Sequence, residues 1–464
     1  MRKVPTQFRP VTQDDLTVEQ VHEPGVPSPL RYAGADHQAP IRYRSNHDRV
    51  AMSASFNLEG EEVSSDEEAT SHGQWPPISF ERAGPRQMLA FDPKETTAAV
   101  VTCGGLCPGL NDVIRALAMC LRYHYGVERV FGIRYGYAGL ADPAIAPLPL
   151  SKHMVSDIHK SGGTILGTSR GFPPIDDIMA GIRRLGINML FTIGGDGTQR
   201  GAHDIHLACR AYGMDVAVIG IPKTIDNDVA WVDQTFGFDT AVGIAADVVE
   251  QLHIEAKSVR HGIGMAKLMG RDAGHIAAAA ALASGDANVV LVPEVPFELD
   301  GPHGLLNFLE RRWQVSDHTM IVVAEGAGQH LFGDTDPGSD HSGNPIYQDI
   351  GLYLRDRIMQ HFAAKGDPVS VKYVDPSYLV RSGRANAADS IFCIRLAHNA
   401  VHAAMAGRTD MMIGRWYGKF THVPLPVATG RLKVMNPRGS VWRAVLENTG
   451  QPAFRNHRED ETVT

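Results

Sequence analysis

Over most of the chain, short runs of apolar residues alternate with longer segments in which apolar residues recur every three or four positions. The runs at 97–103, 188–193 and 215–221 predict short buried strands. The segments at 111–126 and 199–213 predict amphipathic helices. Strands that alternate with helices in this way predict a parallel sheet with helices on both faces.

A second alternation of the same kind follows in the C-terminal half. Its predicted strands are 262–268, 288–294 and 319–326, and its predicted helices are 239–259, 273–284 and 344–366. We therefore expect an α/β fold of two similar doubly wound domains with parallel-rich sheets. Ligands of such sheets bind beyond the carboxyl ends of the strands, and we expect the active site in the cleft between the domains.

The first part of the chain has a different character, because it is rich in Pro, Asp, Glu, Ser and Arg and carries only short apolar patches. The stretch 60–74 predicts a solvated, mobile segment, and ordered structure is expected from about 80–86. The expected divisions are 1–95, a partly mobile N-terminal extension; 96–237, the first part of a nucleotide-binding domain; 238–379, a sugar-phosphate-binding domain; 380–432, a return to the nucleotide-binding domain; and 433–464, a C-terminal segment.

Composition excludes several classes of function. The net charge of -8 argues against non-specific nucleic-acid binding. The apolar run 276–283 is far shorter than the roughly 20 residues of a membrane helix, so we expect no membrane segment. The N-terminus has no apolar stretch of a secretory signal. The scattered cysteines favour a reducing cytoplasm, with Cys103 and Cys107 read as small buried residues.

Three polar turns follow predicted strands: GGLCPG (104–109), GGDGT (194–198) and PKTIDND (222–228). Glycines allow a phosphate to approach backbone N–H groups, and the helix after such a turn adds its positive N-terminal end. A lone Asp196 in such a turn would repel phosphate, but it suits Mg²⁺, which prefers carboxylate, water and phosphate oxygens. Any one turn could be an ordinary tight connection, whereas the three together favour a phosphate–magnesium site.

Phosphoryl transfer to a hydroxyl group requires a base near that hydroxyl. The third turn supplies two candidates, Asp226 and Asp228. One carboxylate can remove the proton, while the other can order a water molecule or hold the loop.

Five motifs occur in a characteristic order: GGDGT, PKTIDND, LMGR (268–271), VAEG (323–326) and YLVRSG (378–383). Together they resemble the 6-phosphofructokinase family. FERAGPR (80–86) and CGGLCPGLNDVIR (103–115) resemble its ATP-dependent branch of plants, protists and some bacteria, which carries an N-terminal extension. The resemblance covers about residues 80 to 430. GGDGT alone is also similar to NAD and lipid kinases.

The resemblance implies phosphorylation of fructose 6-phosphate at its C1 hydroxyl by Mg-ATP, with Asp226 as general base and Asp196 as the Mg²⁺ ligand. The implied ATP-binding residues are Gly105, Arg170, Gly171, Gly195, Asp196, Gly197 and Thr198. The implied fructose 6-phosphate-binding residues are Thr224, Ile225, Asp226, Met269, Gly270, Arg271, Glu325, Tyr378, Leu379, Val380 and Arg381. Asp228, Lys223 and Lys372 are supporting residues. We expect a cytoplasmic homodimer or homotetramer.

Gly197 is the residue that favours ATP, because pyrophosphate users of the family usually have aspartate there. Lys223 points the other way, since pyrophosphate users carry lysine at that position and many bacterial ATP users carry glycine. Bacterial members of the family carry arginines at two positions where this sequence has Gly262 and Lys372. The resemblance therefore does not imply subunit-crossing contacts or the allosteric control built on them. The alternatives are a pyrophosphate-dependent enzyme, another GGDGT kinase and an inactive regulatory subunit.

Overall fold

The computed structural model describes residues 10–34, 41–53, 77–333, 338 and 346–456. The predicted mobile segment 60–74 lies outside these residues. The chain forms two compact units. The first unit contains the chain up to Ile225, Val229–Thr240 and Arg381–Lys433; the second contains Asp226–Asp228, Ala241–Val380 and the chain from Val434.

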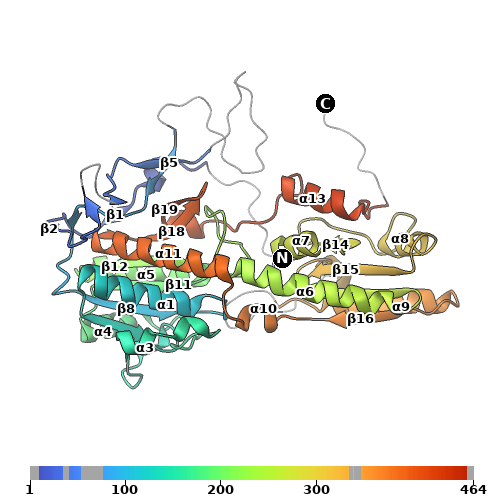
Figure 1. Ribbon diagram of the computed structural model, residues 1–464, viewed down its shortest axis with the longest axis horizontal. Helices are drawn as coiled ribbons and strands as arrows, with labels where there is room; N and C mark the ends of the chain where they lie inside the picture. Colours follow the sequence, from blue (N-terminus) through green and yellow to red (C-terminus); the bar gives the residue numbers. More distant parts are fainter. Residues whose placement is uncertain (1–9, 35–40, 54–76, 334–337, 339–345, 457–464) are drawn as a thin grey trace. The chain divides into compact units, whose positions relative to one another are not determined.

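The first unit is built on a nine-stranded sheet (Figure 1) with the order β10-β9-β8-β11-β12-β18-β19-β6-β5. Its strands are β5 (Arg49–Ala51), β6 (Ser79–Arg82), β8 (Thr97–Thr102), β9 (Arg129–Ile133), β10 (Leu148–Pro149), β11 (Met189–Gly194), β12 (Ala217–Pro222), β18 (Met411–Trp416) and β19 (Lys419–Pro424). The five central strands, β9, β8, β11, β12 and β18, are parallel, and the outer strands pair antiparallel.

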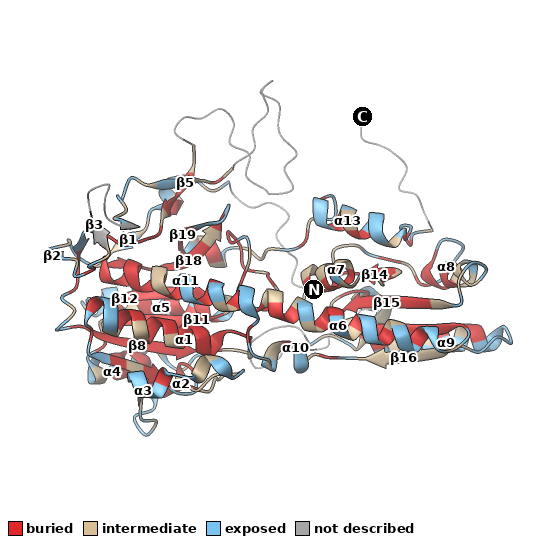
Figure 2. Ribbon diagram, in the orientation of Figure 1, coloured by how far each residue is buried: buried red, intermediate tan, exposed pale blue. Residues whose placement is uncertain are grey.

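The main helices of the first unit lie along this sheet in two pairs, with α1 packed against α11 and α4 against α5. Their bounds are α1 (Leu110–Met119, continued by a π-helical turn Cys120–Tyr125), α4 (Ile175–Leu185), α5 (Asp196–Ala211) and α11 (Ala387–Met405); the shorter elements are α2 (Ala138–Ala141), α3 (Lys152–Val155), α12 (Leu425–Thr429), β1 (Glu19–Gln20) and β17 (Arg408–Thr409). Strands β8, β11 and β12, in the middle of the sheet, are buried throughout (Figure 2). Runs of Val, Ile, Leu and Ala are typical of such doubly covered strands.

The second unit has a four-stranded, fully parallel sheet with the order β14-β15-β13-β16. Its strands are β13 (Gly262–Leu268), β14 (Val289–Leu291), β15 (His318–Ala324) and β16 (Ser370–Val374), and its helices are α6 (Phe238–Lys257), α7 (His275–Ser284), α8 (Leu305–Arg312), α9 (Ile350–Ala364) and α13 (Ser440–Thr449). Helix α6 begins in the first unit. The α/β prediction with parallel-rich sheets is therefore confirmed.

Several predicted boundaries differ from the structure. Helix α9 begins at Ile350 and not at 344, because the Asp349 side chain accepts a hydrogen bond from the Leu352 N–H and caps the helix. Helix α5 begins three residues before the predicted 199, at Asp196. The pattern analysis also missed strands β16, β18 and β19. None of the helices in the described ranges combines the length and the apolar character that a bilayer crossing requires.

Ordered structure also begins well before the expected residues 80–86. A short 3₁₀ helix covers Asp14–Leu16, and strands β5 and β6 extend the large sheet. Leu16, Met52 and Phe80 are buried in the core of the first unit. Leu16 stands in the polar stretch TQDDLTVE, so periodicity alone gives no signal for it.

A buried carboxylate joins the N-terminal part to the rest of the first unit. Glu81, in β6, accepts hydrogen bonds from Arg86 at 2.8 Å and from Arg408 in β17 at 3.0 Å. His422 in β19 lies 3.2 Å away. Burial opposes the ionised form of Glu81, but the hydrogen bond to His422 and the two guanidinium charges outweigh it and lower its pKa well below the usual range.

We predict that Glu81→Gln lowers the melting temperature by about 5–10 °C, because removing one partner of a buried ion cluster leaves the others uncompensated. The exposed Glu95 supplies the matched control, Glu95→Gln, for which no shift is expected. Thermal unfolding followed by circular dichroism makes the comparison. Equal melting temperatures for the two variants would show that the cluster contributes nothing to stability.

Candidate active site

The three polar turns begin at one edge of the first unit's sheet, as predicted. Parallel pairing places Ile193 of β11 opposite Thr102 of β8, and Gly194 opposite Pro222 of β12. The pattern continues one residue further: the Cys103 N–H donates to Ile193 O, and the Lys223 N–H donates to Gly194 O, both at 3.0 Å. The turns after β8, β11 and β12 are thus neighbours.

The middle turn, GGDGT, leads directly into α5. Gly195 is the N-cap residue and Asp196 the first residue of the helix. The first backbone N–H groups of α5 are those that an anion would meet, and the helix dipole adds a partial positive charge there. Gly194 must be glycine, because a Cβ atom there would lie 2.1 Å from Thr198 Oγ1.

Asp196 has the chemistry of a magnesium ligand. Its carboxylate is partly exposed, with a side-chain relative accessibility of 23%, and forms an ion pair with Arg200 one turn along α5. Mg²⁺ is commonly held by one or two carboxylates together with phosphate oxygens and water. One accessible carboxylate at a helix N-terminus that can bind a phosphate fits this pattern.

Arg170 and Gly171, which are also predicted to bind the nucleotide, flank the same edge on a separate loop. The Gly104 N–H donates to Ser169 O at 3.0 Å, and Thr168 Oγ1 donates to Gly104 O at 2.6 Å. These contacts place Arg170 and Gly171, both exposed, beside the turn that contains Gly105. Thr168 and Ser169 were not singled out from the sequence, and only their position beside Arg170 could have suggested them.

Lys223 ties the third turn to the first. Its side chain is buried, and its Nζ atom donates to Gly105 O at 2.5 Å. The Arg381 Nη1 atom lies near the same glycine, 3.8 Å from the position that a Cβ atom on Gly105 would occupy. Two cationic groups therefore converge on the turn after β8.

The remainder of the third turn crosses the division between the units. Thr224 and Ile225 belong to the first unit, and Ile225 is buried. Asp226, Asn227 and Asp228 belong to the second unit. Asn227 has a φ of 55°, a left-handed conformation that asparagine tolerates better than most residues. Both aspartates are partly exposed.

In the second unit, strands β13, β15 and β16 also end at a common edge, with Leu268 opposite Ala324. The Glu325 N–H donates to Leu268 O at 2.8 Å, and the Glu325 carboxylate accepts from the Arg271 N–H at 3.0 Å. Arg271 has a φ of 49°. Met269, Gly270, Arg271 and Glu325, all predicted to bind the sugar phosphate, thus lie together at one edge of the sheet.

Tyr378 and Leu379 are exposed beyond β16, whereas the Val380 side chain is buried and packs into the interior. Lys267, which the sequence analysis missed, supports this segment. It forms ion pairs with Asp349 at 2.7 Å and with Asp375 at 2.8 Å. Burial opposes its charge, but the two hydrogen bonds outweigh that effect and raise the lysine pKa. A lysine in the apolar strand 262–268 was the available signal.

The two departures from the bacterial pattern also have structural positions. A Cβ atom on Gly262 would lie 2.1 Å from Ala256 O, so a side chain there would force a rearrangement. Lys372 lies in β16, opposite Gly264 of β13. Cys103 and Cys107 are buried free thiols, as predicted.

Comparisons with known proteins agree on one family. The family model described as phosphofructokinase matches residues 97–404. ATP-dependent 6-phosphofructokinase of Borreliella burgdorferi is 48% identical, covering 81% of this chain and 86% of the relative. The enzymes of that name from Amycolatopsis methanolica and Trypanosoma cruzi are 45% and 42% identical, each covering 95% of this chain, and 95% and 88% of the relatives.

Solved structures are similar in fold. The pyrophosphate-dependent phosphofructokinase of Marinobacter aquaeolei matches with a TM-score of 0.62 at 21% identity, over 79% of this chain and 94% of that one. The phosphofructokinase of Pichia pastoris in the T-state matches with a TM-score of 0.60 at 22% identity, over 76% of this chain and 37% of that one.

Proposed function

Since the chain belongs to the phosphofructokinase family, we propose that it transfers a phosphoryl group from ATP to the C1 hydroxyl of fructose 6-phosphate. The products are fructose 1,6-bisphosphate and ADP. The observation that carries the proposal is the convergence of three polar turns at one sheet edge, with Asp196 at the N-terminus of α5. Five free cysteines suit a cytoplasmic enzyme.

The phosphates of ATP would be held by the backbone of Gly195–Thr198 and by the positive end of α5. Arg170, Gly171 and Gly105 would flank the nucleotide. Asp196 would hold Mg²⁺, which when bound neutralises charge on the phosphate oxygens. Without Mg²⁺ the Asp196 carboxylate would repel the phosphate. With Mg²⁺ bound, the same carboxylate would hold the ion beside the phosphate oxygens.

Asp226 is the proposed general base. The C1 hydroxyl does not ionise at neutral pH, so a carboxylate within hydrogen-bond reach must accept its proton as the phosphoryl group arrives. Thr224 and Ile225 would line the sugar, and Asp228 would hold the loop.

The sugar phosphate would be bound by Arg271 and Arg381, whose planar guanidinium groups match phosphate oxygens. Glu325 supports this role in two ways. It accepts the Arg271 N–H, which fixes the backbone of that residue, and its partly exposed carboxylate can accept hydrogen bonds from sugar hydroxyls. Met269, Gly270, Tyr378, Leu379 and Val380 complete the proposed sugar-phosphate-binding set.

Gly197 supports ATP as the donor. A Cβ atom there would meet nothing nearer than Arg200 Nη2, at 4.0 Å, so the space beside this residue is open. An aspartate would bring bulk and negative charge into that space. Lys223 remains the residue that favours pyrophosphate, but its Nζ atom already donates to Gly105 O and so has a structural role in either case.

We predict that Asp196→Ala raises the Mg²⁺ concentration needed for half-maximal rate by at least about tenfold and lowers the maximal rate. Asp204→Ala is the matched control, because Asp204 is an exposed aspartate on the same helix. Rates measured across a magnesium titration make the test. A titration curve identical to that of the control would refute the metal-ligand role.

We predict that Asp226→Asn lowers kcat by about 10²–10⁴-fold and leaves the KM for fructose 6-phosphate within a few-fold, because the amide keeps the shape and loses the base. Asp228→Asn, two residues away, should have a smaller effect on kcat. Steady-state kinetics of both variants decide which aspartate is the base. If Asp228→Asn is the more damaging change, the base assignment moves to Asp228.

We predict that the enzyme uses ATP faster than pyrophosphate by orders of magnitude, and that Gly197→Asp abolishes ATP use while the protein still folds. The open space at this position makes the variant a clean test, since a Cβ atom there meets nothing nearer than Arg200 Nη2, at 4.0 Å. Initial rates with each donor, and circular dichroism of the variant, are the measurements. Robust turnover of wild-type protein with pyrophosphate and little with ATP would overturn the donor assignment.

A further inference from the structure

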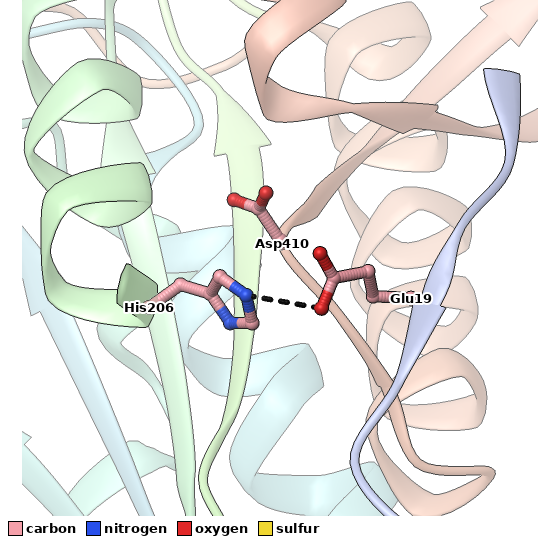
Figure 3. A group of neighbouring side chains, drawn as sticks. All are labelled: Glu19, His206 and Asp410. Carbon is pink, nitrogen blue, oxygen red and sulfur yellow. Dashed lines mark ion pairs between the residues drawn. The ribbon is translucent and has the colours of Figure 1, made fainter. Parts of the chain in front are cut away.

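A cluster of nitrogen and oxygen ligands lies in the first unit, apart from the three turns. Glu19 of β1, His206 of α5 and Asp410, just after β17, are neighbours, and the His206 ring faces the Glu19 carboxylate (Figure 3). One ligand atom from each residue lies within 4.8 Å of the others. His206 and Asp410 are buried, and Glu19 is half exposed, so the cluster is open to solvent from one side.

The hydrogen bonds of Thr409 suggest how the His206 ring is oriented. The Thr409 hydroxyl accepts the Val218 N–H at 3.1 Å and can donate its one proton to Val216 O at 3.3 Å. His206 Nδ1 lies 3.2 Å from the same hydroxyl oxygen and can then donate to it. In a neutral ring this places the proton on Nδ1 and leaves a lone pair on Nε2.

That lone pair faces a carboxylate. His206 Nε2 lies 3.3 Å from Glu19 Oε2. Two acceptors at this distance repel each other unless a proton or a metal ion lies between them. Two ligands about 2.1 Å from a tetrahedral ion are about 3.4 Å apart, so the observed separation matches a metal site.

Asp410 and His206 also form hydrogen bonds that orient their side chains, as metal ligands in proteins commonly do. Asp410 is bound by His203 Nδ1, which lies 2.9 and 3.0 Å from the two carboxylate oxygens and fixes their orientation. The hydrogen bond from His206 Nδ1 to Thr409 orients the ring in the same way. Such outer contacts are typical of histidine and carboxylate ligands.

We propose that Glu19, His206 and Asp410 bind a divalent transition-metal ion of the zinc class. A ligand set with an imidazole nitrogen suits zinc and its neighbours, whereas Mg²⁺ and Ca²⁺ prefer oxygen ligands alone. The site is distinct from the one at Asp196, which lies ten residues, or about 15 Å, away along α5. The ion holds the N-terminal strand β1 against helix α5, which begins within the proposed nucleotide-binding turn.

The test uses the full-length protein, freed of metal with a chelator, and Zn²⁺ alone as the probe. Equilibrium dialysis with atomic-absorption detection should find one ion per chain with a Kd of about 1 µM or lower, and saturation should raise the melting temperature by about 3 °C or more. Co²⁺ should give a visible absorption band of a low-coordinate site. Mg²⁺ at the same concentration should do neither.

Two variants separate this site from zinc bound at other histidines. Glu19→Gln removes a half-exposed ligand and should weaken Zn²⁺ binding at least tenfold without harming the fold. Glu23→Gln, an exposed glutamate four residues along the same segment, should bind like the wild type. Absence of a stoichiometric ion, or equal affinity in Glu19→Gln and wild type, would overturn the proposal and leave a simple His206–Glu19 hydrogen bond.

Discussion

The candidate active site depends on the parallel register of β8, β11 and β12. Because Thr102 and Ile193 are opposite each other, and Gly194 is opposite Pro222, the three strands end at nearly the same level. Each strand must turn there, so the three turns lie side by side at one edge of the sheet. A register shift of one residue would turn every side chain of a strand to the other face and would separate these turns.

Buried charged groups then hold the turns and loops in position. Lys223 connects two turns through Gly105 O, Lys267 connects the start of α9 with the end of β16, and Glu81 connects the N-terminal strands with β17. Each is buried or half-buried with hydrogen-bonding partners, as charged groups in a protein interior must be. Their shared role is to position the backbone.

The fold alone does not decide the phosphoryl donor. A pyrophosphate-dependent enzyme shares this fold at 21% identity, with a TM-score of 0.62. The relatives at 42–48% identity are named ATP-dependent. Donor choice therefore rests on local differences within one scaffold, and the open space at Gly197 is the local feature that the structure adds.

The sequence alone determined the α/β class, the three polar turns and the family, because these follow from local periodicity and from short contiguous motifs. It did not reveal strands β16, β18 and β19, the ordered N-terminal strands, or the role of Lys267. Only the tertiary structure decided that Glu19, His206 and Asp410, separated by about two hundred residues each, come together. Such contacts depend on the pairing of β1 with β17 and the packing of α5, and no local pattern encodes them.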